Sequence, residues 1–211
     1  MTEARPPLSQ AQYVEAATEF VDEHGLGALT MRALGTRLGV DATAIYRHFP
    51  TKEALIDAIL DNLLAPLVAA PVSDGADPRE ALWEMLHRVW NEFQRHPNLP
   101  GAFATATGAF PNGLEYTRRI IGLLRALGLS GPDLVEGYQL LESYVIGSNI
   151  LNTGGNPSTW EIRQTRYRFL GEPEFTTAAS DPERVREVAH RAFPTGLELI
   201  FAELERRAIR F

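Results

Sequence analysis

The chain has no cysteine among its 211 residues, and this absence excludes disulfide bonds, thiolate chemistry and metal sites with cysteine ligands. It has no apolar stretch approaching the ~20 residues that a membrane-spanning helix needs. Its first residues, MTEARPPLSQ, lack the basic stretch and the following apolar run of a signal peptide. We therefore expect a cytoplasmic protein that makes no contact with a membrane.

The sequence also lacks the residue patterns that assemble common catalytic sites. Its five histidines include no pair four residues apart beside a carboxylate, and no glycine-rich phosphate-binding loop is present. Ser143 and Ser148 fall within a predicted helix rather than at the sharp turn that exposes a nucleophilic serine. We expect no enzymatic activity, no cofactor and no bound metal.

Positive charge is in the minority, because the formal net charge is −7 at pH 7. The basic residues are unevenly placed, and residues 30–52 have a local balance of +3, from Arg32, Arg37, Arg47 and Lys52 against Asp41. The segment before them is acidic. A protein with an acidic body and one basic edge would bind DNA only through that edge, in a single orientation.

What the sequence does contain is the pattern of two short helices joined by a glycine. Thr30 is placed to cap the first helix, which buries Met31, Leu34 and Leu38 at a spacing of three to four residues. Gly39 provides the left-handed residue that ends this helix. A second helix can therefore begin directly after the glycine.

Asp41 is placed to cap that second helix, in which Ile45 and Phe49 share the inward face. The remaining side chains then point outward: Thr43, Tyr46, Arg47 and His48. Two short helices joined in this way form a helix-turn-helix, and the second helix has the size that enters the major groove of DNA. The alternative is a tight helical hairpin in some other all-α protein.

A further helix is expected before this pair, because two helices this short bury too little apolar surface to be stable alone. Ser9 and Gln12 form a capping-box pattern at its start, and the helix is predicted to end at about His24. The predicted N-terminal domain is thus a three-helix unit over residues 1–53.

The run GLGALTMRALGTRLGVDATAIYRHFPTKEALIDAIL resembles, without a gap, the DNA-binding domain of the TetR family of bacterial transcription regulators. Tyr46, Phe49, Lys52 and Leu55 stand at the family's spacing. The resemblance implies a homodimer that binds a palindromic double-stranded DNA operator through residues 41–49 of each subunit. The candidate DNA-contacting residues are Thr30, Arg32, Ala42, Thr43, Ala44, Tyr46, Arg47, His48 and Lys52.

These candidates fall into two kinds of contact. Thr43 and Ala44 stand at the start of the second helix, where side chains meet base edges and thymine methyl groups. The resemblance assigns phosphate contacts to Tyr46, His48 and Lys52. Phosphate contacts position a protein on the duplex, whereas base contacts select the sequence.

The rest of the chain is predicted to be helical, with no convincing strand and no repeat. Thr51 is placed to cap a helix that Pro66 kinks or Pro71 ends. Further helices are predicted over residues 77–96, 101–108, 113–127, 133–152 and 158–170, then from 181 to before Pro194 and over 195–210, with a loop at 171–180. The fold class is all-α, with the helix-turn-helix domain followed by a larger helical domain for ligand binding and dimerisation over residues 54–211.

The closing segment FPTGLELIFAELERR is similar to the last helix of many TetR-type regulators, which packs with an earlier long helix into a four-helix bundle across a twofold axis. The earlier helix here would be residues 134–151, whose small residues allow close approach. The alternative is that both helices lie in the core of a monomer. We favour the homodimer, because a palindrome read by one short helix per subunit requires two subunits.

The second domain is rich in aromatic side chains near polar ones, which favours a largely apolar pocket with a few orienting groups. Tryptophan and tyrosine are also poorly suited to a plain core, because their N–H and O–H groups need partners. The alternative is ordinary core packing. The candidate ligand-binding residues are Trp83, His87, Trp90, Phe93, Phe103, Phe110, Tyr116, Tyr138, Tyr144, Asn149, Asn152, Trp160 and Tyr167.

The resemblance implies a ligand-responsive regulator, usually a repressor, that a small-molecule inducer releases from DNA. In relatives that bind metal-chelated drugs, histidines of the second domain hold the metal, and the stretch NLPGAFATATG after His96 contains none. We therefore expect an apolar or aromatic inducer without a metal. Two alternatives stay open: a regulator controlled by a partner protein instead of an inducer, and a helical enzyme or carrier with a borrowed DNA-binding domain.

Overall fold

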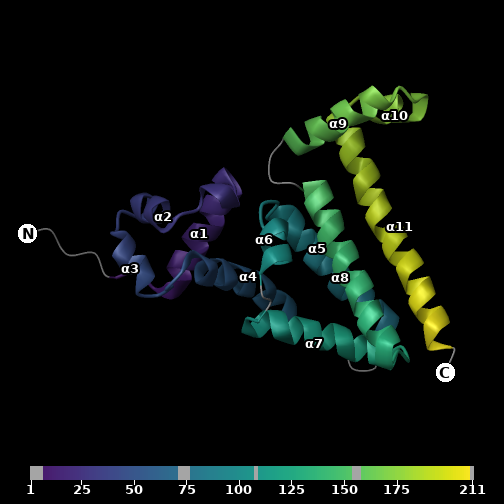
Figure 1. Ribbon diagram of the computed structural model, residues 1–211, viewed down its shortest axis with the longest axis horizontal. Coiled ribbons are helices and arrows are strands. Elements are labelled where there is room, and N and C mark those ends of the chain that lie inside the picture. Colours follow the sequence, from purple (N-terminus) through teal and green to yellow (C-terminus); the bar gives the residue numbers. More distant parts are fainter. Residues whose placement is uncertain (1–6, 71–76, 107–108, 154–157, 210–211) are drawn as a thin grey trace, which may run out of the picture.

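The computed structural model describes residues 7–70, 77–106, 109–153 and 158–209, and within these ranges its regular elements are all helices (Figure 1). The predicted all-α fold is confirmed. None of the described helices is both long and apolar enough to span a membrane. The elements are α1 (Gln10–His24), the 3-10 turn η1 (Leu26–Ala28), α2 (Met31–Leu38), α3 (Ala42–Tyr46), α4 (Lys52–Ala69), α5 (Pro78–Arg95), α6 (Pro100–Thr105), α7 (Pro111–Ala126), α8 (Gly131–Thr153), α9 (Ser158–Leu170), α10 (Pro173–Ala178) and α11 (Pro182–Ala208).

Each N-terminal helix begins at the cap that its sequence predicts. Ser9 and Gln12 form the reciprocal hydrogen bonds of a capping box at the start of α1. The side-chain oxygens of Thr30 and Asp41 accept backbone N–H groups at the starts of α2 and α3. Gly39 ends α2 with a φ of 66°, in the left-handed region. The helix boundaries of this unit therefore follow from local residues alone.

The turn between α2 and α3 is tight because of a glycine that the sequence pattern did not single out. A Cβ at Gly35 would lie 2.8 Å from the carbonyl oxygen of Val40, which is closer than real Cβ contacts come. Ile45 and Phe49 are both buried as predicted, but α3 ends at Tyr46, so Phe49 lies just beyond the helix in which it was expected. This close packing fixes the direction of α3 relative to α2.

Helix α4 connects the N-terminal unit to the rest of the molecule (Figure 1). It packs against α1 at its start, and further along it packs against α5 and most extensively against α7. The helix passes through Pro66 and ends at Ala69, so Pro66 does not terminate it. Pro71, the other predicted stop, lies outside the described residues. Because one helix belongs to both parts, a shift at α7 can move the N-terminal unit.

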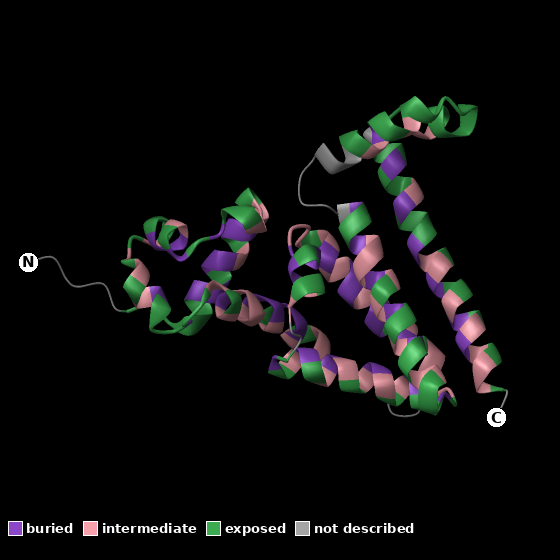
Figure 2. Ribbon diagram, viewed as in Figure 1, coloured by how far each residue is buried: buried purple, intermediate pink, exposed green. Residues whose placement is uncertain are grey.

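The second part of the molecule is built around α5, α7 and α8, with α11 packed against α8. Helices α9 and α10 lie at the start of α11, far from the N-terminal unit (Figure 1). Figure 2 shows that α9 and α10 are mostly exposed, whereas α5 and α8 turn buried residues toward one another. The core therefore lies between α5, α7, α8 and α11.

Two predictions for the last part of the chain are wrong. Residues 171–180, predicted as a loop, contain α10, whose first residue Pro173 has the fixed φ that suits the first turn of a helix. Asp181 does cap a helix, as predicted, and its carboxylate accepts the N–H of Glu183. That helix runs through Pro194 to its end, so α11 is one element rather than two.

Tyr144 of α8 contacts α11 beside the proline inside that helix. Pro194 has no N–H to donate within the helix. The Tyr144 hydroxyl donates to the carbonyl groups just before it, those of Ala192 at 3.1 Å and Phe193 at 2.9 Å. Gly196 leaves room for the tyrosine, because a Cβ there would overlap the hydroxyl. A contact between helices distant in sequence thus joins α8 to α11 beside Pro194, and α11 continues where the local rule predicts a break.

Candidate DNA-binding surface and candidate ligand pocket

Helix α3 presents an exposed face at the end of the N-terminal unit (Figure 2). Tyr46 has 51% of its surface accessible, and Thr43, Arg47 and His48 are exposed as well. All the candidate DNA-contacting residues lie in this unit and at the start of α4. Thr30 and Arg32 are exposed. Ala42, Ala44 and Lys52 are half-buried.

Two of these side chains are held in place by neighbours. The Thr43 hydroxyl donates to the Asp41 carboxylate at 2.6 Å. That bond, together with the N–H bond from the Thr43 backbone, lowers the pKa of Asp41. The His48 ring packs against Tyr13 of α1, with ring centroids 5.2 Å apart. The face of α3 is therefore partly ordered before any DNA arrives.

One basic residue of the predicted edge is already neutralised within the unit. The Arg37 guanidinium donates to Glu23 of α1 at 2.8 Å and to Glu19 at 3.2 Å. The hydrogen bond from Arg37 lowers the pKa of Glu23. Arg37 thus links α2 to α1, and it is a poor candidate for a phosphate contact.

Lys52 is also positioned by the protein, at the junction of α4 with the N-terminal unit. Its ammonium nitrogen lies 3.4 Å from the carbonyl oxygen of Leu26, which places the charge beside the turn after α1. With Arg37 paired, the basic edge consists of Arg32, Arg47 and Lys52. These three charges are not paired with a carboxylate among the described residues.

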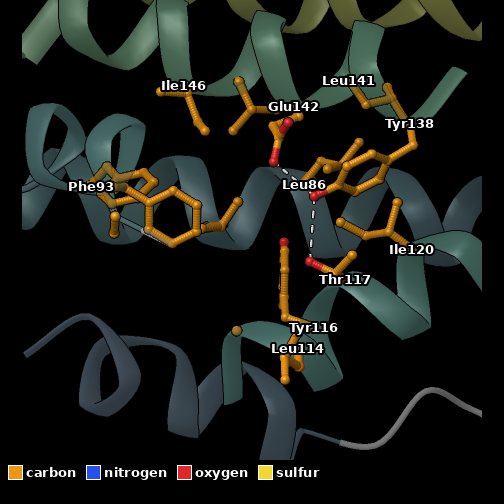
Figure 3. A pocket seen from close by; sticks show the side chains of 15 residues that line it. Leu86, Phe93, Leu114, Tyr116, Thr117, Ile120, Tyr138, Leu141, Glu142 and Ile146 are labelled. Atoms are coloured by element: carbon orange, nitrogen blue, oxygen red, sulfur yellow. Dashed lines mark hydrogen bonds between the residues drawn. The ribbon is translucent and has the colours of Figure 1, made fainter. Parts of the chain in front are cut away.

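A cavity of about 270 Å³ lies among α5, α6, α7 and α8 (Figure 3). Four of the candidate ligand-binding residues line it: Phe93, Phe103, Tyr116 and Tyr138. The sequence did not single out the others, which are Leu86, Val89, Ala106, Gly113, Leu114, Thr117, Ile120, Leu141, Glu142, Val145 and Ile146. Most of these are aliphatic, and no residue-type signal separates an aliphatic pocket wall from ordinary core.

The remaining candidates lie elsewhere. Phe110 is buried 6.4 Å from Phe103, measured between ring centroids. Tyr167 packs on Phe175 between α9 and α10. The side chain of Trp160 lies outside the described residues. Trp83, His87, Trp90 and Tyr144 belong to an aromatic cluster of α5, α8 and α11, in which Trp90 stacks on Phe193 at 4.6 Å.

The two asparagines among the candidates are buried and hydrogen-bonded, and neither lines the cavity. Asn149 donates to the carbonyl of Val145 and accepts from Gln94 of α5 at 3.0 Å. Asn152 accepts from Arg163 of α9 at 2.6 Å. Both residues therefore tie α8 to neighbouring helices.

The polar part of the cavity wall is concentrated on one side. The Tyr138 hydroxyl donates to Glu142 at 2.8 Å and lies 3.4 Å from the Thr117 hydroxyl. Tyr116, by contrast, donates its hydroxyl to the carbonyl of Met85, and complete burial raises its pKa. Glu142 was missed from the sequence, although it is a lone carboxylate in the apolar run YQLLESYVIG.

Several polar contacts attach the N-terminal unit and α4 to the second part, among them the bond between His96 and Asp22 of α1 at 2.8 Å. The backbone N–H of Asn112, at the start of α7, donates to the Asp61 carboxylate of α4 at 2.6 Å. Asn98, in the turn before α6, donates to the carbonyl of Val21 near the end of α1 at 2.8 Å. Because Gly113 and Leu114 follow Asn112 and line the cavity, the Asn112 contact joins the cavity wall to α4.

Among the described residues, no three histidine, aspartate or glutamate side chains are grouped so that they could hold a metal ion. The cavity wall contains no histidine and a single carboxylate. The arrangement is suited to binding an organic molecule through apolar contacts and a few hydrogen bonds.

The chain is similar in sequence and in fold to known transcriptional regulators. The chain is 31% identical over 145 residues to the HTH-type transcriptional repressor DrrR1 of Streptomyces coeruleorubidus. The matched region covers 68% of this chain but only 53% of that protein. It is 39% identical over 209 residues to the tetracycline repressor protein class C of Escherichia coli, covering 94% and 91% of the two chains. The fold is similar to that of Streptomyces coelicolor ActR in complex with actinorhodin, with a TM-score of 0.74, 26% identity and coverage of 96% and 99%.

Family models match nearly the whole sequence. Residues 14–59 match the bacterial regulatory proteins of the tetR family. Residues 70–208, more than half of the chain, match the tetracyclin repressor-like C-terminal domain. Members of this family are transcriptional regulators, which agrees with the prediction that the chain is not an enzyme. With a matching helix-turn-helix unit followed by a matching helical domain, the chain belongs to the TetR family of bacterial transcriptional regulators.

Proposed function

We propose that the chain is a ligand-responsive repressor that binds a palindromic operator as a homodimer and is released by a small apolar or aromatic inducer. Residues 1–53 bind DNA, and residues 54–211 bind the inducer and the second subunit. The protein acts in the cytoplasm, where its operator lies. The observation that carries the proposal is an exposed helix of DNA-reading size joined through α4 to an enclosed apolar cavity.

The contacts with DNA follow from the exposed face of α3. Thr43 and Ala44 meet base edges, while Tyr46, His48 and Lys52 contact phosphates. The Arg37 pair leaves three basic side chains per subunit for the DNA backbone. The electrostatic part of the affinity is therefore modest, and base contacts by α3 carry much of the preference for the operator.

The homodimer is supported by apolar side chains that one subunit leaves uncovered on α8 and α11. Leu151 of α8 has 60% of its surface exposed, and Leu199 of α11 has 70%. A Cβ at Gly147 would meet no atom within 4 Å inside the subunit, so α8 is open at that point. Apolar helix faces of this kind are stabilised when a second copy covers them.

The inducer site is the cavity among α5, α6, α7 and α8. Its volume of about 270 Å³ lies near the lower end of ligand pockets, roughly 300 Å³, which favours a compact molecule. Phe93, Phe103 and Tyr116 offer aromatic surfaces to stack against rings. No histidine lines the cavity, so we propose that the inducer binds without a metal.

Inducer binding is transmitted to α3 through α7 and α4. A ligand that displaces Gly113 and Leu114 also displaces Asn112, which is bonded to Asp61 of α4. Moving the protein from nearly all DNA-competent to nearly all released requires about 5.5 kcal/mol of differential affinity. Burial of an aromatic molecule in one of the two states can supply that difference.

The proposal can be tested with operator DNA selected from a random double-stranded library by the full-length protein. Naphthalene and anthracene derivatives are then titrated into the labelled complex, with and without a chelator, while fluorescence anisotropy is recorded. We expect DNA release that is unchanged by the chelator. Because coupling is reciprocal, the operator must weaken binding of the same compound by the same factor, which calorimetry measures.

Two matched variants, one in the cavity wall just after α6 and one on the exposed side of α6, test the location of the ligand site. Ala106→Phe places a ring in the cavity and should abolish the response to these compounds without weakening operator binding. Ala104→Phe, on the exposed side of the same helix, serves as the control. Binding that operator does not affect, or release that a chelator abolishes, would refute the mechanism. Operator binding without a response to any compound would instead favour control by a partner protein.

A further inference from the structure

One charged side chain stands in the wall of an otherwise apolar or hydroxyl-lined cavity. Among the residues that line it, Glu142 of α8 is the single titratable acid, and none of the others is basic. Figure 3 shows its carboxylate directed into the space enclosed by Phe93, Tyr116 and Ile146. Glu142 is half-buried, so its carboxylate faces the cavity while keeping some contact with solvent.

The partners of Glu142 within the protein leave that charge uncompensated. Its Oε1 accepts the Tyr138 hydroxyl at 2.8 Å, and the Thr117 hydroxyl lies 3.4 Å behind that of Tyr138 (Figure 3). In the part of the chain that the structure describes, no basic side chain lies within 4.0 Å of the carboxylate. An ionised carboxylate has about four acceptor sites, so one hydroxyl leaves most of them free.

The Tyr138 hydroxyl bonds the Glu142 carboxylate directly, and the Thr117 hydroxyl bonds Tyr138. Burial, together with the hydrogen bond to Glu142 and against a lowering by the Thr117 bond, raises the pKa of Tyr138 to about 12, so the phenol stays protonated at neutral pH. Tyr138 therefore acts as a fixed donor that holds Glu142 in one orientation. The free oxygen is then available to a group brought in by the ligand.

We propose that Glu142 selects inducers with a protonated amine: the natural inducer is an aromatic ring system with an alkylamine substituent, whose rings lie against Phe93 and Phe103 and whose ammonium group binds the Glu142 carboxylate. This assignment rests on the function proposed above and specifies the chemistry of the inducer. A neutral hydroxyl would occupy one acceptor site but leave the charge, whereas a cation supplies the counter-charge that the cavity wall lacks. An anionic ligand would be repelled.

The test compares three probes with the same ring and different head groups: 1-naphthylmethylamine, 1-naphthylmethanol and 1-naphthoic acid, with their anthracene counterparts. Calorimetry on the full-length dimer at pH 7 should give the amine a dissociation constant at least about tenfold lower than that of the alcohol. The acid should bind most weakly. Operator release should follow the same order.

Glu142→Gln removes the charge while keeping an oxygen that accepts the Tyr138 hydroxyl. In this variant the amine and the alcohol should bind within about twofold of one another, with alcohol affinity unchanged. Glu136→Gln, an exposed glutamate earlier on the same helix, should keep the full preference. Thermal unfolding of both variants checks that the fold is intact.

The outcomes separate this inference from the function on which it rests. Equal binding of amine and alcohol by the wild type, or a preference that survives Glu142→Gln, would overturn the role of Glu142. No binding of any probe would overturn the cavity as the ligand site, and the Glu142 assignment with it. Tight, Glu142-dependent amine binding that leaves the operator complex intact would refute the proposed induction alone.

Discussion

At the scale of single residues, the DNA-facing surface combines side chains that are free to adjust with side chains that the protein already holds. Tyr46 and Arg47 are exposed on α3, whereas Thr43 is bonded to Asp41. Lys52 belongs to the second kind, because its ammonium group lies beside the Leu26 carbonyl. A held cation loses less conformational freedom when a phosphate binds, so its contribution to affinity is larger.

Lys52→Ala should weaken DNA binding to a similar degree on operator and non-operator sequences. Each lost phosphate contact reduces the slope of log affinity against log salt by about one unit per subunit. Fluorescence anisotropy over a salt series measures the slope. Arg191→Ala, which removes an exposed charge from α11, should leave the slope unchanged. A changed base preference with an unaltered slope in Lys52→Ala would rule out the backbone contact.

Prediction from the sequence was also most successful for single residues. Ser9, Thr30 and Asp41 were identified as caps because a cap depends on a side chain and on backbone groups two or three residues away. Glu142 was missed because its meaning depends on the neighbours that other helices bring to it. The sequence around it reads as one polar residue in an apolar helix.

At the scale of elements, the long C-terminal helix departs from a local rule, because it continues through Pro194. Pro194 predicts a helix end, and the sequence offers no sign that Tyr144, on another helix, donates to the carbonyl groups beside it. The space for that hydroxyl exists because residue 196 is glycine. The contact between α8 and α11 at this point thus depends on a pairing that only the folded chain reveals.

Gly196→Ala should therefore destabilise the fold, since the new methyl group overlaps the Tyr144 hydroxyl. Overpacking of this kind costs about 1–3 kcal/mol. Gly122→Ala is the matched control, because a Cβ at that exposed helical position meets nothing within 4 Å, and it should stabilise by roughly 0.5–1 kcal/mol. Urea unfolding of both variants gives the comparison. Equal stability of Gly196→Ala and wild type would show that Tyr144 can move aside without cost.

At the scale of the whole molecule, the exposed apolar side chains of α8 and α11 are suited to contact with a second copy of the chain. The sequence-based prediction chose these two helices from their small and apolar residues, and it remains a prediction for this chain. The structure adds that Leu140, Leu151 and Leu199 are exposed in a single subunit. An isolated subunit would leave this apolar surface in water.

Gly147→Arg should produce a folded monomer. The position is open within the subunit, but an arginine there would bring an unpaired charge into the contact between subunits. Analytical ultracentrifugation measures the change, and operator affinity should fall with the loss of the second recognition helix. Gly101→Arg, at an equally open position on α6, should remain dimeric. A dimeric Gly147→Arg protein would place the interface on another face.

The site at this largest scale could be predicted only in part. The helix-turn-helix surface lies within a continuous segment, so its exposed face follows from helical periodicity. The cavity is formed by residues of four helices, and four of its aromatic residues were identified from residue type alone. Its aliphatic walls could not be, because which faces of α5, α7 and α8 converge is decided by tertiary packing.

The position of Lys52 has one more consequence, because it is the only lysine in the chain. Apart from the N-terminal amino group, each subunit thus offers a single amine to acylating reagents, and it stands at the junction of α4 with the unit that carries α3. Every other basic side chain is an arginine or a histidine, which such reagents leave largely unmodified. Mass spectrometry of acylated protein therefore yields a one-site footprint, and we expect operator DNA to shield Lys52 from acylation.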